Sequence, residues 1–299
     1  MALLRTEAEK LSNNDLISGV IEEIIDREET FALLPFVGVN GKAYVYNREN
    51  VLATASWLDP NTNVPEDAST FTTVTALVKI LIGDVDVDKF LQTMDDTNDQ
   101  KATQIALKAK ALAREFHRTF AEGDEGTTPQ EFDGLPNQVT VGQTMQAGTN
   151  GAALALTMLD ELADMVPNGA DAYVMRSGTI RAYYALLRAA GGTTPVMIEL
   201  ENFGKPVLSH NGIPILRNDY LAINETLGSG TDLTSVYAVR MNEADGLHGI
   251  YAGPNAGIVV EDIGTVQNRD ATRTRLKWYT GLALKSTRSL ARLEGITNI

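Results

Sequence analysis

Residues 97–121, TNDQKATQIALKAKALAREFHRTFA, carry the most regular helical pattern in this chain of 299 residues. Thr97 and Gln100 have the spacing of a capping box, and Gly123 follows the last turn. At 1.5 Å per residue this helix would be about 36 Å long, which is longer than a compact domain of this size usually needs. We therefore predict a scaffold helix. Its apolar side chains recur every three or four residues, at Ile105, Ala109, Leu112, Phe116 and Phe120.

The segment before this helix predicts a long β-hairpin. Residues 43–58 and 70–88 are rich in Val, Ile, Thr and Tyr, and the turn formers DPNTNVPED at 59–67 separate them. An isolated two-stranded ribbon is marginally stable in water unless its faces and edges meet another surface. The hairpin is therefore expected to need a partner surface.

The first periodic segment of the chain, residues 12–27, carries one apolar stripe and an acidic opposite face. Such a stripe packs either against the core of its own chain or against another subunit. The sequence leaves both interpretations open. The members of the stripe are Leu16, Ile17, Val20, Ile21, Ile24 and Ile25.

The chain after the long helix predicts a second lobe. Turn formers concentrate from Gly123 to Gly151, around FDGLPN at 132–137, and mark an internal boundary. Two helices at about 151–166 and 178–190 then alternate with short strand candidates, which is typical of a mixed α/β lobe. The strand candidates are 172–176, 195–200, 206–209, 213–217, 234–241 and 256–262.

The end of the chain is basic, in contrast with the rest. Residues 269–299 carry seven basic and two acidic side chains, whereas residues 1–268 carry 18 and 37. Within this end, 272–288 predict a strand with one basic face, formed by Arg273, Arg275 and Lys277.

Three carboxylates alternate along the second arm of the predicted hairpin, at Asp84, Asp86 and Asp88. Alternation places them on one face of a strand. Clustered carboxylates could hold a hard cation, but the glycine and terminal glutamate of a calcium loop are missing. The other interpretations are an acidic face that discourages edge aggregation, or one that meets the basic strand of its own or a neighbouring chain.

Composition excludes several classes of protein. With 43% hydrophobic and 21% charged residues, the chain can bury a core. A net charge of −14 argues against a protein that grips nucleic-acid backbones. Cysteine is absent, which removes disulfides and thiolate metal sites, and no apolar run approaches the roughly 20 residues of a transmembrane helix.

Motifs of catalysis are also missing from the sequence. It contains no phosphate-binding loop, dinucleotide fingerprint, metalloprotease motif or nucleophile elbow. His117, His210 and His248 lie far apart along the chain. We therefore predict no catalytic residues, no cofactor site and no metal site, in a protein that is not an enzyme.

The order of these elements resembles the major capsid (coat) protein family of tailed bacteriophages, whose fold herpesvirus floor domains and encapsulins share. The resemblance covers nearly the whole chain, and its anchors are FDGLPN (132–137), FGKPV (203–207), IPI (213–215) and RLKWYTGLAL (275–284). It implies a mixed α+β fold with an N-terminal arm, an extended β-hairpin loop, a long spine helix in a peripheral domain, and an α/β axial domain.

The resemblance also implies domain boundaries. About 40 residues precede the hairpin, so we expect a separate scaffolding protein, and the tip from 59 to 69 has no lysine, so we expect a noncovalent shell. The boundaries are 1–40 for the arm, 41–88 for the hairpin loop, 89–140 with 257–299 for the peripheral domain with spine helix 97–121, and 141–256 for the axial domain.

The function that this resemblance implies is structural. The protein would assemble in the host bacterial cytoplasm, as hexamers and pentamers, into the icosahedral head of the virion, which encloses double-stranded DNA. Its expected partners are copies of itself, a portal, a separate scaffolding protein and a decoration protein, with no membrane. The expected contacts between subunits are Leu16, Ile17, Val20, Ile21, Ile24, Trp57, Leu58, Pro60, Val64, Pro65, Asp84, Asp86, Asp88, Arg273, Arg275 and Lys277.

Two other functions stay open. An encapsulin-type compartment would use the same fold to enclose an enzyme instead of DNA. A soluble α/β hydrolase or binding protein is the alternative without a shell, but it would lack a nucleophile elbow and would leave the hairpin without support.

Overall fold

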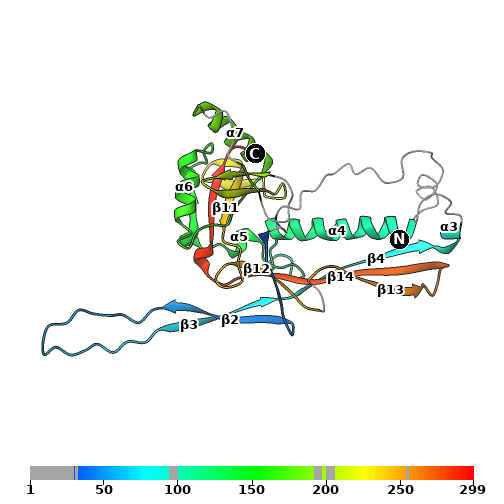
Figure 1. The fold of residues 1–299 in the computed structure, drawn as a ribbon, viewed down its shortest axis with the longest axis horizontal. Helices are drawn as coiled ribbons and strands as arrows, with labels where there is room; N and C mark the ends of the chain where they lie inside the picture. Colours follow the sequence, from blue (N-terminus) through cyan, green and yellow to red (C-terminus); the bar gives the residue numbers. More distant parts are fainter. Residues whose placement is uncertain (1–29, 31–32, 94–99, 192–196, 200–205, 254–255) are drawn as a thin grey trace.

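The computed structural model describes residues 30, 33–93, 100–191, 197–199, 206–253 and 256–299. The molecule has three parts (Figure 1). A long sheet lies along helix α4, a rounded lobe with a second sheet stands at one end of that helix, and a two-stranded ribbon projects beyond the same end. The mixed α+β class that the sequence predicts is confirmed.

The first sheet is built around its longest strand, β14. Strands β12 and β13 pair with successive parts of one edge of β14, and β4 pairs with the opposite edge. Strand β1 extends the sheet by pairing in parallel with β12. The five strands are β1 (Phe36–Gly38), β4 (Lys79–Asp88), β12 (Leu247–Tyr251), β13 (Val259–Thr265) and β14 (Ala271–Leu284).

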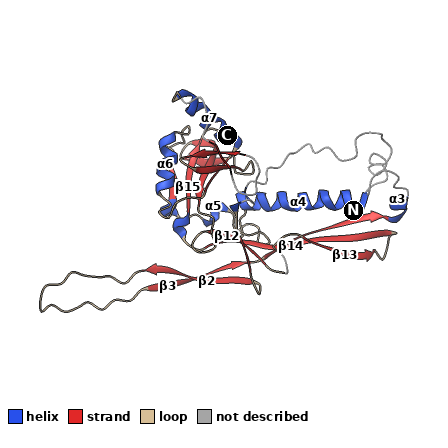
Figure 2. Cartoon of the chain, viewed as in Figure 1, coloured by secondary structure: helices blue, strands red, loops and turns tan. Residues whose placement is uncertain are grey.

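Helix α4 (Gln100–Glu122) packs on one face of this sheet because apolar positions alternate along β14. Leu276 is buried against Leu112 of the helix. Trp278 stacks on Phe116, with ring centroids 4.7 Å apart and an interplanar angle of 28°. The predicted scaffold helix is therefore found, and it runs along the sheet for its whole length (Figure 2).

The end of α4 is fixed by close contact between two glycines. The backbone N–H of Gly134 donates to the carbonyl oxygen of Gly123 at 2.9 Å, and Asn137 Nδ2 donates to the same oxygen at 2.8 Å. A Cβ on Gly134 would lie 2.5 Å from the carbonyl oxygen of Thr119, so only glycine fits there. FDGLPN thus anchors the short helix α5 (Leu135–Gln138) against the spine.

The second sheet has eight strands in the order β5-β15-β11-β6-β9-β8-β7, with β10 paired to β11. One face packs on α6 (Leu156–Asp164) and α7 (Ser177–Ala189), and the other packs on α5 and the end of α4. The strands are β5 (Thr144–Gln146), β6 (Ala172–Met175), β7 (Met197–Glu199), β8 (Pro206–His210), β9 (Ile213–Arg217), β10 (Glu225–Leu227), β11 (Gly230–Val239) and β15 (Leu290–Ile296).

The ribbon consists of β2 (Ala43–Val51) and β3 (Thr70–Leu77), which pair only with each other. The hairpin predicted over 43–58 and 70–88 is therefore wrong in its second arm. Beyond Leu77 the chain leaves the ribbon, and 79–88 become β4 of the first sheet. The carboxylates of β4 face the arginines of β14 in this register, which favours the change of partner.

The helices after the boundary lie close to their predicted places, although α6 begins only at Leu156. Two strands fall on the other side of the predicted division. Strand β12, inside 141–256, pairs in the first sheet, and β15, inside 257–299, pairs in the second, because the chain crosses between the sheets at 240–246 and at 285–289. No helix among the described residues is long and apolar enough to cross a membrane.

Candidate functional site

The outer part of the ribbon exposes apolar side chains to solvent. Trp57 is fully exposed, and Val64 exposes 76% of its surface. Leu58, Pro60 and Pro65 are exposed as well. Clustered apolar side chains on a projecting element are a usual mark of a protein–protein contact. We refer to residues 52–69 as the ribbon tip.

Polar contacts hold the two sides of the ribbon tip together. The backbone N–H and the hydroxyl of Thr54 both donate to Asp67 Oδ2, at 3.0 and 2.9 Å. The N–H of Ala53 donates to Ser69 Oγ at 3.0 Å. The Thr54 N–H holds the pKa of Asp67 below its ordinary value. The tip therefore has a defined shape even where its strands are no longer paired.

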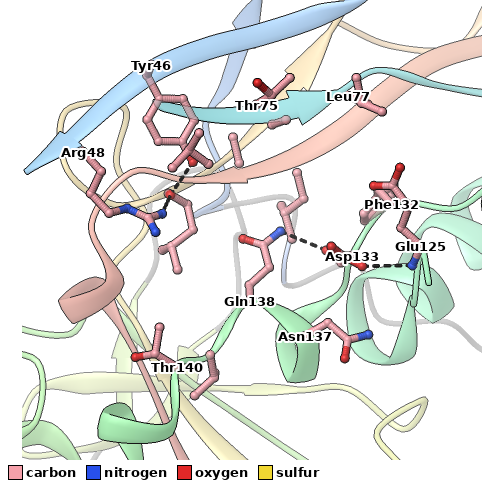
Figure 3. Close-up of a pocket in the computed structure, with 16 residues that line it drawn as sticks. Tyr46, Arg48, Thr75, Leu77, Glu125, Phe132, Asp133, Asn137, Gln138 and Thr140 are labelled. Atoms are coloured by element: carbon pink, nitrogen blue, oxygen red, sulfur yellow. Dashed lines mark hydrogen bonds between the residues drawn. The ribbon is translucent and has the colours of Figure 1, made fainter. Parts of the chain in front are cut away.

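The root of the ribbon lies over the end of β14 (Figure 3). Tyr46 Oη donates to the carbonyl oxygen of Leu284 at 2.5 Å, and Arg48 Nη2 donates to the same oxygen at 2.7 Å. Arg48 Nε donates to the carbonyl oxygen of Lys285 at 2.8 Å. A groove of about 300 Å³ separates this root from α5, with Gln138 and Thr140 on its far wall.

The face of the first sheet opposite α4 carries paired charges. Arg273 binds Asp86 through two hydrogen bonds of 2.6 and 2.7 Å, and Arg275 binds Asp84 in the same way at 2.7 and 2.9 Å. Lys277 Nζ lies 2.6 Å from Glu261 Oε2 on β13. The hydrogen bonds from the arginines hold the pKa values of Asp84 and Asp86 below their ordinary value.

An apolar patch continues this face toward the ribbon. Ile82 stands opposite Lys277 and Ile80 opposite Tyr279 in the pairing of β4 with β14. Ile80 exposes 67% of its surface and Ile82 46%. We call Ile80, Ile82 and Tyr279, together with the two bidentate pairs, the outer face. It offers an apolar area beside charges that neutralise one another.

Comparison with solved structures decides the fold. The holo-SrpI encapsulin complex from Synechococcus elongatus is similar with a TM-score of 0.75 and 20% identity, over 99% of this chain and 96% of that one. The capsid of an empty GTA particle is similar at 0.70 and 14% identity, over 96% of each chain. The chain has the phage capsid fold. The capsid of cyanophage A-1(L) gives 0.68 and 14%, over 96% of this chain and 98% of that one.

No family model matches the sequence, and no curated protein matches it. The phage capsid fold is therefore carried by the arrangement of elements and not by sequence identity. Low identity over a nearly complete structural match is what a fold maintained by packing pattern allows.

The structure brings the predicted acidic and basic strands of this capsid fold together, and it does so within one chain. Asp88 is the exception, since its Oδ1 accepts from the N–H of Phe90 at the start of α3 (Lys89–Thr93). Contact of these charged residues with a neighbouring subunit stays a prediction, as does contact through the ribbon tip. The arm residues Leu16, Ile17, Val20, Ile21 and Ile24 lie outside the described residues.

Ile80 and Ile82 are surface residues that the sequence analysis missed. They precede Asp84, Asp86 and Asp88 with the same alternation, so the pattern that placed the carboxylates on one face also places the isoleucines there. The alternation is visible in the sequence, but the hairpin predicted over 43–58 and 70–88 places both isoleucines in a free arm. Only the pairing with β14 shows which face they share.

A polar cluster inside the second lobe has a structural role. His210 Nε2 lies 2.9 Å from Asp160 Oδ1, and Tyr183 Oη lies 3.2 Å from His210 Nδ1. Tyr183 also donates to the carbonyl oxygen of Ser209 at 3.1 Å. Tyr183 and His210 are both buried and Asp160 lies at the surface, so this chain of hydrogen bonds joins α6, α7 and β8.

His248 on β12 should make the stability of the folded chain sensitive to acid. The residue is fully buried, and burial lowers its pKa below the ordinary value of 6.5. As the pH falls through 6.5, the unfolded chain takes up a proton that the folded chain resists, so the free energy of unfolding should decrease. Above that pH the imidazole is neutral in both states and should contribute no slope.

Urea unfolding between about pH 5 and 8 checks this prediction, because the slope of stability against pH reports the difference in bound protons. The variant His248→Gln should flatten the slope below 6.5 and leave it unchanged above that pH. An identical slope in the variant would assign the acid sensitivity to other groups.

Proposed function

We propose that this protein is the subunit of a closed icosahedral shell, and that the shell is the head of a tailed phage, with a structural and non-catalytic role. The observation that carries the proposal is the ribbon. Its apolar tip has no packing partner among the described residues of its own chain. It projects from a fold that matches capsid and encapsulin structures over 96–99% of the chain.

The proposed contact is between the ribbon tip of one subunit and the outer face of its neighbour. Ile80 and Ile82 supply an apolar area for Trp57, Leu58 and Val64 to cover. The adjacent pairs of Asp84 with Arg275 and of Asp86 with Arg273 are already satisfied. A neighbour can cover paired charges at lower cost than unpaired ones.

This contact joins two different surfaces of the same chain. Each subunit offers one ribbon and one outer face, and such a heterologous contact closes into rings when the rotation between subunits permits. Hexamers and pentamers are the rings that an icosahedral head requires. The amphipathic segment 12–27 of the arm is proposed as a second contact with a neighbouring subunit.

The two sheets correspond, in this proposal, to the two domains of a shell subunit. The first sheet with α4 would form the peripheral domain, and the second sheet with α6 and α7 would form the axial domain that points to the ring centres. The shell would be noncovalent, since the ribbon tip contains no lysine. Its partners in the virion would be a portal, a separate scaffolding protein and a decoration protein, with assembly in the host cytoplasm.

The charge of the chain suits a shell around double-stranded DNA. At −14 per subunit, the wall has little tendency to bind phosphate backbones. Each Lys or Arg contact with a phosphate strengthens binding to DNA, and a wall with many such contacts would hinder both filling and release. The acidic balance therefore supports enclosure without attachment.

An encapsulin-type compartment is the second candidate, and one observation favours it. The encapsulin from Synechococcus elongatus is more similar to this chain, in TM-score and in identity, than the two capsids described above. Such a shell would use the same ribbon contact but would enclose a protein.

Electron microscopy of the expressed full chain tests shell formation, which both candidate functions require. Closed particles, or rings of five and six subunits, are the expected result. A compact monomer that persists at high concentration would overturn both. Sedimentation velocity on the same sample gives the fraction of chain in each species.

The contents of shells from the source organism separate the two candidates. Nuclease treatment followed by extraction should release protected double-stranded DNA from a phage head. A packaged protein species without protected DNA would replace the phage proposal by the compartment. The two outcomes are distinguished by gel electrophoresis of nucleic acid and of protein from one preparation.

A further inference from the structure

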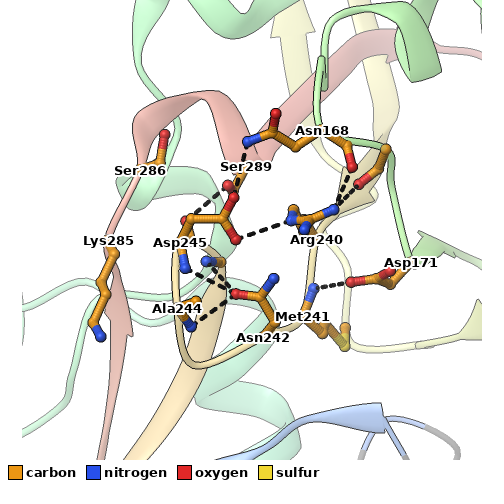
Figure 4. Close-up of polar contacts among 12 residues, drawn as sticks. Asn168, Asp171, Arg240, Met241, Asn242, Ala244, Asp245, Lys285, Ser286 and Ser289 are labelled. Carbon is orange, nitrogen blue, oxygen red and sulfur yellow. Dashed lines mark hydrogen bonds and ion pairs between the residues drawn. The ribbon is translucent and has the colours of Figure 1, made fainter.

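Two of the connections between the two sheets bind each other (Figure 4). The first, 240–246, leads from β11 to β12, and the second, 285–289, leads from β14 to β15. We call these two segments together the crossing.

The crossing is held by backbone hydrogen bonds from both sides. The N–H of Ser286 donates to the carbonyl oxygen of Asp245 at 3.0 Å, and Ser289 Oγ donates to the same oxygen at 2.8 Å. The N–H of Arg240 donates to the carbonyl oxygen of Ser289 at 2.8 Å. Because each connection belongs to both sheets, these bonds tie the sheets to each other, in addition to the packing of their shared core.

Side chains fix the shape of the first connection. Asn242 Oδ1 accepts from the N–H groups of Ala244, Asp245 and Gly246, at 3.0, 2.9 and 2.9 Å. Arg240 Nε donates to Asp245 Oδ1 at 3.0 Å. A Cβ on Gly246 would lie 2.5 Å from the carbonyl oxygen of Arg240, so the turn needs glycine there. The crossing is therefore a tightly specified structure.

The ribbon binds the second connection at the point where it begins. Alternation along β2 turns Tyr44, Tyr46 and Arg48 toward the body of the molecule. Tyr46 and Arg48 donate to the carbonyl oxygens of Leu284 and Lys285, as described above. The Tyr44 ring lies under Lys285 Nζ, 5.8 Å from the ring centroid, and Nζ in turn donates to Glu243 O at 2.6 Å.

We infer that the crossing links the ribbon and the two sheets. Through it, Arg48 and Tyr46 couple the direction of the ribbon to the relative placement of the two sheets. A displacement of the ribbon root moves the carbonyl groups of Leu284 and Lys285, and the amides of Lys285 and Ser286 are bonded to Gly246 and Asp245. Arg48 is a positioning residue. It makes no ion pair with a carboxylate among the described residues, and its Nε and Nη2 donate to main-chain oxygens.

Hydrogen exchange of the full chain tests the coupling with two reciprocal variants. Arg48→Met keeps the side-chain stem and removes both hydrogen bonds. The amides of Arg240, Lys285 and Ser286 should then exchange about tenfold faster, because local opening of the crossing no longer breaks the two hydrogen bonds of this charged donor. Asn242→Ala loosens the crossing, and by reciprocity the amides of β2 and β3 should exchange faster.

A matched control separates coupling from a local effect. Thr73→Val removes the exposed bond from Thr73 Oγ1 to Asn47 Oδ1 within the ribbon and touches nothing in the crossing. It should leave the exchange of the crossing unchanged. If Arg48→Met accelerates exchange only in 43–51 and 70–77, the coupling is refuted. If that variant does not fold, Tyr46→Phe removes a single hydrogen bond to the carbonyl oxygen of Leu284. It should accelerate exchange at the same amides of the crossing, by a smaller factor.

The test does not depend on shell formation. Exchange is compared between the wild-type chain and each variant in the same state of assembly, so a chain that stays monomeric still reports the coupling. A failure of the microscopy described above would leave this inference standing, and a failure here would leave the shell proposal standing.

Discussion

Replacement of the ribbon tip, residues 52–69, by Asn-Gly is expected to leave a folded subunit that no longer forms shells. The two strands of the ribbon can be joined by a two-residue turn of this type. Trp57, Leu58 and Val64 would be lost, and each is expected to contribute roughly 1.5–3 kcal/mol when a neighbour covers it. Because a shell repeats this contact at every subunit, loss of the apolar contact should shift nearly all of the protein into unassembled species.

Sedimentation velocity and negative-stain microscopy measure the effect, and urea unfolding should give a stability within about 0.5 kcal/mol of the wild type. A second variant keeps the ribbon at full length and changes Trp57, Leu58 and Val64 to Ser. Loss of shells in both variants assigns the contact to apolar side chains. If the shortened chain is unfolded, the ribbon tip belongs to the core of its own subunit and the proposed contact is wrong.

The change Trp278→Ala should produce the largest loss of stability, about 3–5 kcal/mol. Trp278 exposes only 6% of its surface, stacks on Phe116 at 4.7 Å and lies 5.9 Å from the ring of Phe36. Its removal leaves a cavity between α4 and the first sheet, and a buried layer of aromatic rings cannot close around such a gap.

Urea unfolding followed by circular dichroism measures this loss. The second tryptophan supplies the matched control, since Trp57 is fully exposed and Trp57→Ala should change subunit stability by less than about 0.5 kcal/mol. Trp57→Ala should instead weaken assembly. A loss below about 1 kcal/mol for Trp278→Ala would mean that α4 is held to the sheet mainly by other contacts.

The helices were predictable because each repeats its apolar positions over several turns. The apolar spacing from Ile105 to Phe120 predicts which face of α4 is buried. The helices at 156–164 and 177–189 likewise predict that the second lobe contains α/β structure. The break between β3 and β4 was not predictable. The β-like pattern continues without interruption through Val78, and the change of partner depends on β14, whose Arg273 lies 187 residues after Asp86.

Five strands of the sheets, β1, β5, β10, β12 and β15, lie outside the strands that the sequence predicts, and two of them show different reasons. Strand β12 is short and contains His248 and Gly249, neither of which favours a strand on its own. Strand β15 carries Arg292 and Glu294, which resemble a polar tail until the ion pair of Arg292 with Glu225 at 3.0 Å is seen. Both strands are defined by partners that lie far away in the chain.

The candidate contact was predictable in part. Turn formers flanked by Trp57 and Val64 mark an exposed hairpin end, and alternating charges predict that acidic and basic strands can meet. Whether they meet inside one chain depends on register, which a single sequence does not contain. The bonds of Arg48 go to main-chain carbonyl groups, which are present at every residue and therefore leave no pattern to read.

The position of β14 and β15 in the chain has a consequence for synthesis. Strand β14 is the central strand of the first sheet, and β15 lies between β5 and β11 in the second. A ribosome makes both strands after every partner they join, so neither sheet can close while translation is still in progress on residues before 271. Chains that end before residue 271 would therefore lack the central strand of the first sheet and β15 of the second, and such unfinished chains are open to proteolysis.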